Sequence, residues 1–136
     1  MSLVTADTSV VVPALADWHE HHDIARAATT DIDRLPAHVL AESFSVLTRL
    51  PHGLSLAPDD ATSLLFGAFP GPPLTLHAEA YCTLLQQLGA AGIRGGAVYD
   101  GLVAASAAGA SAELLTLDAR ATATYRAVGA RFRSPG

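Results

Sequence analysis

The chain has 136 residues, of which 50 % are hydrophobic and only 15 % are charged. This length and composition fit one compact domain with a buried core, and they argue against a disordered chain. All eight basic residues are arginine. The lack of lysine excludes a Walker A phosphate loop, which requires one. The net charge of −5 argues against a protein that holds nucleic acid by electrostatics alone.

The chain shows no sign of export or of membrane insertion. Its one cysteine, Cys82, excludes an intrachain disulfide. No basic segment precedes a long apolar stretch at the start, and no run approaches the ~20 apolar residues that a membrane span needs. We therefore expect a cytoplasmic protein that does not enter a membrane. Because no linker or repeat divides the sequence, residues 1–136 are predicted to form a single domain.

The first half of the chain begins with a strand and continues mainly as helix. Residues 3–6 are predicted to form a strand, and the apolar stretch behind it contains Pro13, which favours a loop or a first helical turn there. Helices are predicted at 17–29 and 37–50, separated by a minor extended segment at 33–36.

The second half alternates between the two kinds of element. Helices are predicted at about 55–69, 77–90, 97–108 and 118–128, and strands at 74–76, 112–117 and 131–133. Short apolar strands that alternate with helices indicate a parallel sheet covered on both faces. The predicted fold class is therefore α/β, a three-layer α/β/α sandwich with a short, mainly parallel central sheet.

Two aspartates directly follow predicted strands. Asp7 comes after the first strand, and Asp118 ends the apolar run of the late strand. The carboxyl ends of parallel strands are where open sheets place their ligands. Each aspartate also suits the N-cap of the helix that follows, so both interpretations stay open.

Two further acids lie in apolar helices. Glu42 has Val39 and Val46 one turn away, and Asp100 lies in the least polar helix of the chain. A carboxylate that points toward a core is costly unless it is paired, so a structural salt bridge and a functional site are both open for each. Several carboxylates within ~4–6 Å of one another would repel, and a divalent cation removes that conflict. Oxygen ligands favour Mg²⁺ or Mn²⁺.

Four motifs occur in register along nearly the whole chain. They are residues 4–9, which include Asp7, the pair Ala41–Glu42, the helix segment 99–107, which includes Asp100, and residues 114–118, which end on Asp118. With these motifs the chain resembles the PIN-domain ribonucleases of the VapC toxin type.

The resemblance implies that Asp7, Glu42, Asp100 and Asp118 are the acidic quartet of a metal-dependent ribonuclease. It implies that the three aspartates are direct ligands of one or two Mg²⁺ or Mn²⁺ ions. Glu42 would act through water, or as the base that orients it.

The resemblance also implies supporting residues near the quartet. Thr8 or Ser9 would support the metal or a phosphate, and Thr116 would hold a ligand in place. Arg120 departs from the family, in which many relatives have a polar or acidic residue two positions after the last aspartate. This leaves a second metal position open and suggests that Arg120 holds RNA phosphate.

The expected activity is that of a Mg²⁺- or Mn²⁺-dependent endoribonuclease, the toxin of a toxin–antitoxin pair. By the same resemblance, the expected partners are RNA, a small cognate antitoxin protein and a second copy of the chain in a homodimer. Two alternatives stay open. One is a catalytically weakened PIN domain that binds RNA or protein, and the other is a metal-dependent phosphohydrolase of small phosphoesters.

Overall fold

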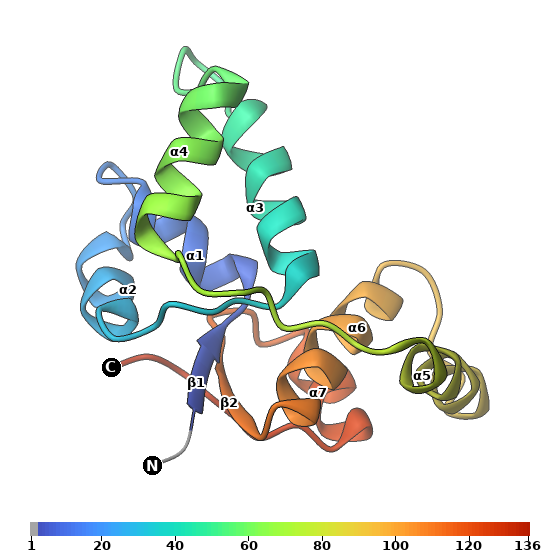
Figure 1. Ribbon diagram of the computed structural model, residues 1–136. Helices are drawn as coiled ribbons and strands as arrows, with labels where there is room; N and C mark the ends of the chain where they lie inside the picture. The colour runs from blue at the N-terminus through green and yellow to red at the C-terminus, as the bar shows by residue number, and fades with distance from the viewer. Residues whose placement is uncertain (1–2) are drawn as a thin grey trace.

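The computed structural model describes residues 3–136, so the first two residues of the predicted domain lie outside it. Within that range the chain forms three strands and seven helices (Figure 1). The elements in chain order are β1 (Leu3–Ala6), α1 (Thr8–Leu15), α2 (His22–Thr29), α3 (Ala37–Thr48), α4 (Pro58–Ala68), α5 (Ala78–Ala90), α6 (Ala97–Gly109), β2 (Ala112–Leu115), α7 (Thr122–Val128) and β3 (Phe132–Arg133).

The central sheet is short and entirely parallel among the described strands. Its order is β1-β2-β3, with β2 in the middle. Ala6 at the end of β1 lies opposite Leu115 at the end of β2. The residues that follow these two strands therefore emerge side by side at one edge of the sheet. The predicted α/β class with a parallel sheet is confirmed.

An extended segment runs beside β1, as predicted for residues 33–36. The hydroxyl of Thr5 donates a hydrogen bond of 2.8 Å to the carbonyl of Arg34, and Pro36 pairs with Leu74 in a parallel bridge. The strand predicted at 74–76 is wrong, because only this bridge forms. The segment that pairs with Leu74 becomes α3 directly after Pro36, so residues 75 and 76 have no neighbouring strand to pair with.

Three helices begin later than predicted, among them α4, which begins at Pro58 rather than at about residue 55. The chain turns over residues 16–21 before α2, and α7 begins at Thr122 rather than at Asp118. A turn after β2 occupies residues 118–121 instead. In this turn the Asp118 carboxylate accepts the backbone N–H of Arg120 at 3.0 Å. This side-chain contact competes with helical hydrogen bonding.

Burial explains why α1 is helical although it contains Pro13. Val10, Val11 and Val12 are almost fully buried in the core. Pro13 lacks an N–H and removes one helical hydrogen bond, but the helix ends two residues later, so apolar burial outweighs that loss. Of the two alternatives predicted there, a helical turn is confirmed and a loop is wrong.

Small residues let α6 approach its neighbours closely. A Cβ atom built on Gly101 would meet the side chain of Leu88 on α5 at 2.8 Å, so a larger residue would push the two helices apart. Asp100 is the neighbour of Gly101, and the close contact therefore fixes the segment of α6 that bears it. No helix among residues 3–136 is long and apolar enough to cross a membrane.

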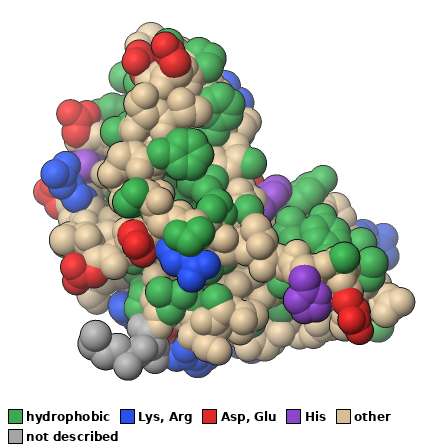
Figure 2. Space-filling view, viewed as in Figure 1, with side chains coloured by type: hydrophobic (Ala, Val, Ile, Leu, Met, Phe, Trp, Pro, Cys, Tyr) green, Lys and Arg blue, Asp and Glu red, His purple; other side chains and the backbone are tan. Residues whose placement is uncertain are grey.

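Two large apolar side chains of α4 are exposed to solvent. Leu64 and Phe66 are 38 % and 55 % exposed, and Figure 2 shows hydrophobic side chains on the surface over this helix. Together with Leu40 and Phe44 of α3, Phe66 lines a shallow groove between the two helices.

Candidate functional site

The ends of β1 and β2 bring two of the predicted site residues together. Asp7 is the N-cap of α1, and its Oδ1 atom accepts the backbone N–H of Ser9 at 3.0 Å. Asp118 follows β2 across Thr116 and Leu117. The N-cap role of Asp7 is therefore confirmed, and it coexists with a place in a pocket. Asp118 is not the N-cap of α7, which is Ala121.

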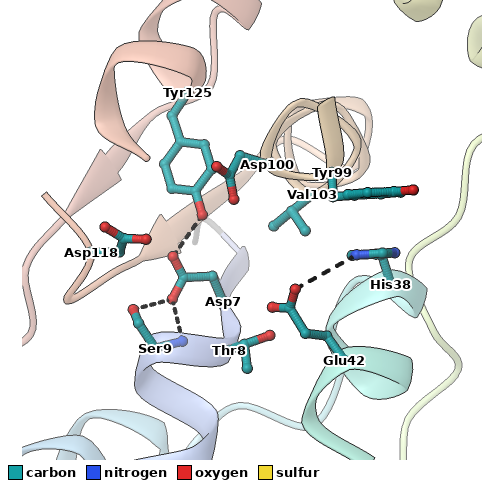
Figure 3. Close-up of a pocket in the computed structure, with 10 residues that line it drawn as sticks. All are labelled: Asp7, Thr8, Ser9, His38, Glu42, Tyr99, Asp100, Val103, Asp118 and Tyr125. Carbon is teal, nitrogen blue, oxygen red and sulfur yellow. Dashed lines mark hydrogen bonds and ion pairs between the residues drawn. The ribbon is translucent and has the colours of Figure 1, made fainter. Parts of the chain in front are cut away.

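All four predicted carboxylates line one small pocket at this edge of the sheet (Figure 3). Asp7 and Asp118 come from the strand ends, Glu42 from α3 and Asp100 from α6. The residues that line the pocket are Asp7, Thr8, Ser9, His38, Glu42, Tyr99, Asp100, Val103, Asp118 and Tyr125. Four segments that are far apart in the sequence thus present carboxylates to one space.

Asp7 is the most firmly held of the four. Its residue is only 5 % exposed. The hydroxyl of Ser9 donates a hydrogen bond to Oδ1, and the buried hydroxyl of Tyr125 donates one of 2.6 Å to Oδ2. Burial raises the pKa of Asp7 above its usual value, and the hydrogen bonds from Ser9 and Tyr125 oppose that rise. The geometry fixes both carboxylate oxygens before any ligand arrives.

The Ser9 hydroxyl also joins the two strand ends. It accepts the backbone N–H of Leu117 at 2.8 Å while it donates to Asp7. Thr116 lies 3.5 Å from the same hydroxyl, and its own Oγ1 atom accepts the N–H of Asp118 at 3.0 Å. Ser9 and Thr116 therefore couple the positions of Asp7 and Asp118.

The electrostatics of Asp100 show that the carboxylates act on one another. Burial raises the pKa of Asp100 to about 6, and the charges of Asp118, Glu42 and Asp7 add to the rise. Arg120 opposes it. Mutual repulsion of this kind is expected where several acids share a site, and a bound cation would relieve it.

Glu42 lies on the open side of the pocket. The side chain of Glu42 is 46 % exposed, and the next residue, Ser43, is the one that points into the core. The expectation that Glu42 points toward the apolar face of the helix is therefore wrong, because the following residue, Ser43, occupies that position. His38, one turn earlier on α3, places its Nε2 atom 3.9 Å from Glu42.

Arg120 lies at the rim of the site. Its side chain is 97 % exposed, and its Nε atom is 3.9 Å from Oδ1 of Asp118. Exposed pairs of this length contribute little to stability, so the guanidinium is available to a ligand. Arg49 and Arg94 are near Glu42 and Asp100 in the sequence, but among residues 3–136 neither forms an ion pair with any of the four acids.

The chemistry of the donors fits a hard divalent cation. The pocket has a volume of about 40 Å³, which is room for an ion with a few waters. The hydroxyl of Thr8 is buried at the pocket and has no hydrogen-bond partner. No three acidic, histidine or cysteine side chains in the described range already stand at metal-ligand spacing. Mg²⁺ needs only one or two direct carboxylates and keeps several waters, so water can fill the remaining positions.

Four residues that line the pocket were not predicted as site residues, namely His38, Tyr99, Val103 and Tyr125. His38 could have been found, because it lies four residues before Glu42 and therefore on the same helix face. Tyr125 gave no such signal, since it meets Asp7 across 118 positions of the chain. Only the fold brings that hydroxyl to the carboxylate.

The histidines between α1 and α2 form no metal site in the described chain. The Nδ1 atom of His19 accepts the backbone N–H of His21, and His22 contacts the carbonyl of Pro13 at 2.8 Å. These side chains stabilise the turn that leads into α2.

Comparison with known proteins places this chain in a family. Residues 4–127 match the family described as PIN domain. The chain is 46 % identical over 127 residues to Ribonuclease VapC27 of Mycobacterium tuberculosis, covering 93 % of this chain and 92 % of that protein. It is 41 % identical over 123 residues to Ribonuclease VapC40 of the same species, covering 90 % of this chain and 92 % of that protein.

A solved structure supports the same fold. It is titled "Structure of FitAB bound to IR36 DNA fragment", and it matches with a TM-score of 0.69 at 19 % sequence identity. The match covers 98 % of this chain and 95 % of the other. At this identity the likeness concerns the fold alone. The family match spans most of the chain, and the similar ribonucleases are matched over nearly their full length, so the chain belongs to the PIN-domain family and is of the VapC type.

Proposed function

We propose that this protein is a divalent-metal-dependent endoribonuclease, a hydrolase of RNA phosphodiester bonds, and that residues 1–136 form its single PIN domain. The observation that carries the proposal is the pocket in which Asp7, Glu42, Asp100 and Asp118 converge from four separate segments. The names of the two similar VapC ribonucleases support RNA as the substrate.

The three aspartates are proposed to hold one or two Mg²⁺ or Mn²⁺ ions, directly or through water. When bound, such an ion supplies Lewis-acid stabilisation of phosphate charge and lowers the pKa of water. It also turns an acidic pocket into a site for phosphate. This accounts for how a chain with a net charge of −5 can bind RNA.

The remaining residues position the reacting groups. Ser9 and Tyr125 keep Asp7 oriented through their hydrogen bonds. Glu42 is proposed to orient the attacking water and to accept its proton at a carboxylate oxygen. The exposed guanidinium of Arg120 is proposed to bind a phosphate oxygen. Thr8 or Ser9 is proposed to support the metal or a phosphate.

We further propose that the protein is the toxin of a toxin–antitoxin pair, inhibited by a small antitoxin protein, and that it forms a homodimer. The support is the VapC name of its relatives. The exposed apolar groove between α3 and α4, lined by Leu40, Phe44 and Phe66, is the kind of surface that a protein partner covers.

The test is an incubation of the purified protein with structured RNA and Mn²⁺, alongside the variant Asp7→Asn. Cleavage by the wild type that EDTA and the substitution both abolish is the expected result. The matched control is Asp17→Asn, which changes an aspartate outside the pocket and should leave cleavage intact.

Other outcomes would overturn the proposal in different ways. RNA binding without cleavage, equal in both proteins, would indicate a binding module. Turnover of small phosphoesters without any RNA cleavage would indicate a phosphohydrolase. Cleavage that persists in EDTA would contradict the role of a metal.

A further inference from the structure

Two aromatic rings stand at the edge of the carboxylate pocket. Tyr99 immediately precedes Asp100 on α6, and His38 lies one turn before Glu42 on α3. Their rings are stacked, with an interplanar angle of 1° and 5.1 Å between the ring centroids (Figure 3). Both side chains line the same pocket as the acids. The stack thus bridges the two helices that bear Asp100 and Glu42.

The two tyrosines of the pocket differ in what they offer. Tyr125 is 1 % exposed, and its hydroxyl is committed to Asp7. Tyr99 is 55 % exposed, although it packs against His38. Part of its surface is therefore available to a ligand. An accessible aromatic ring beside a phosphate-binding centre is suited to a planar group.

The charge of the pocket points in the same direction. None of the ten lining residues is arginine, and the chain carries a net charge of −5. The pocket therefore contains no lysine or arginine side chain that could attract RNA. Stacking of bases on aromatic rings does not need positive charge, and it provides much of the affinity of many single-strand binders.

We propose that Tyr99, backed by His38, is the platform on which an unpaired base of the RNA stacks, next to the phosphate that enters the carboxylate pocket. The inference rests on the proposed ribonuclease function and names the form of its substrate. A base within a duplex has both faces covered by its neighbours, so the platform requires a nucleotide that is splayed out of a helix. Every base has a π face, so the platform distinguishes unpaired from paired RNA rather than one base from another.

The test compares three substitutions at one position. Tyr99→Leu removes the aromatic ring, Tyr99→Phe keeps it, and Tyr99→Trp enlarges it. The matched control is Trp18→Leu, because Trp18 is 48 % exposed and lies beside His19, at 5.8 Å between ring centroids, outside the pocket. KM and kcat are measured on an unstructured RNA and on a duplex of the same sequence. Quenching of 2-aminopurine in the unstructured RNA reports stacking, in a non-cleaving Asp118→Asn background.

Tyr99→Leu is expected to raise KM for unstructured RNA about tenfold, with little change in kcat, since a base–aromatic stack is lost. It should also abolish the 2-aminopurine quenching and reduce the preference of the enzyme for unstructured RNA over duplex RNA. Tyr99→Phe and Trp18→Leu should behave as the wild type does.

If folded Tyr99→Leu has the KM and the quenching of the wild type, the inference is overturned, and the stack is only a structural contact between α3 and α6. If circular dichroism shows that Tyr99→Leu does not fold, Tyr99→Trp tests the inference instead. Its larger ring should lower KM, and an unchanged or raised KM would contradict stacking of a base at this position. Failure of the wild type to cut any RNA would refute the ribonuclease proposal itself. Wild-type cleavage that is insensitive to Tyr99 would refute only the platform.

Discussion

The two sides of the carboxylate pocket are built differently. On the closed side, Asp7 is 5 % exposed and receives hydrogen bonds from Ser9 and Tyr125. On the open side, the Glu42 side chain is 46 % exposed, and its one contact with a basic side chain among residues 3–136 is with the Nε2 atom of His38, at 3.9 Å. One carboxylate is oriented by the core, and the other is free to adjust.

This difference suggests that Asp7 and Glu42 have different roles. A ligand that is held by buried hydrogen bonds loses little conformational entropy when a cation binds, which favours metal affinity. An exposed glutamate retains rotamer freedom, which suits a residue that must follow water and substrate. We therefore expect substitutions on the closed side to affect metal binding, and those on the open side to affect turnover.

The largest effect is expected for Asp7→Asn. Loss of this charge weakens cation binding and removes several kcal/mol of transition-state stabilisation, which corresponds to a loss of at least ~10³-fold in kcat/KM. Initial rates of RNA cleavage over a range of Mn²⁺ concentrations measure it. Activity within tenfold of the wild type would mean that the closed side does not hold the ion.

Glu42→Gln is expected to lower kcat by roughly 10²-fold, the usual contribution of a general base. The Mn²⁺ concentration for half-maximal rate should stay nearly unchanged, since the open side is not proposed to hold the metal directly. The same titration separates the two effects. A large shift in the metal dependence with kcat preserved would reverse the assigned roles.

Tyr125→Phe removes only the hydroxyl that orients Asp7. Loss of such a supporting contact costs about 10- to 100-fold in metal affinity. Excess Mn²⁺ should therefore restore most of the rate, which it cannot do for Asp7→Asn. Calorimetric titration of Mn²⁺ gives the affinity, and Thr122→Ala at the half-buried first residue of α7 is the matched control. An unchanged affinity would show that the burial of Asp7 alone suffices.

The smallest effect concerns the stability of the metal-free protein. Folded Asp100 holds its proton more tightly than the unfolded chain, so stability should fall as the pH rises from 3.8 to about 6. Asp100→Asn removes that cost, and it should raise the free energy of unfolding at neutral pH by about 1 kcal/mol after allowance for solvent screening. Thermal unfolding in EDTA measures this.

Saturating Mn²⁺ should reverse the order of the two proteins, because the wild type gains more from the bound ion. If Asp100→Asn is no more stable than the wild type in EDTA, neither burial nor the neighbouring carboxylates destabilise the charged form of Asp100 in the metal-free protein.

The sequence was sufficient to predict what depends on local pattern. The apolar run before Asp7 and the apolar run before Asp118 predicted parallel strands whose ends meet, and the fold confirms this. Boundaries were less accessible where a side chain competes with the backbone, as Asp118 does before α7.

Contacts between distant segments could not be predicted. The direction of Glu42 depends on how α3 rotates against α1, and the periodicity assigned it one position too close to the core. Tyr125 reaches Asp7 only because α7 returns across the end of the sheet. Neither feature leaves a trace in the residues that flank it.

The most direct test of the acidic centre is a crystal of the protein soaked in Mn²⁺ and measured at the manganese absorption edge. We expect an anomalous peak inside the pocket, among the carboxylates of Asp7, Asp100 and Asp118, with Glu42 farther away. A pocket without a peak, or a peak only at the histidines between α1 and α2, would contradict it.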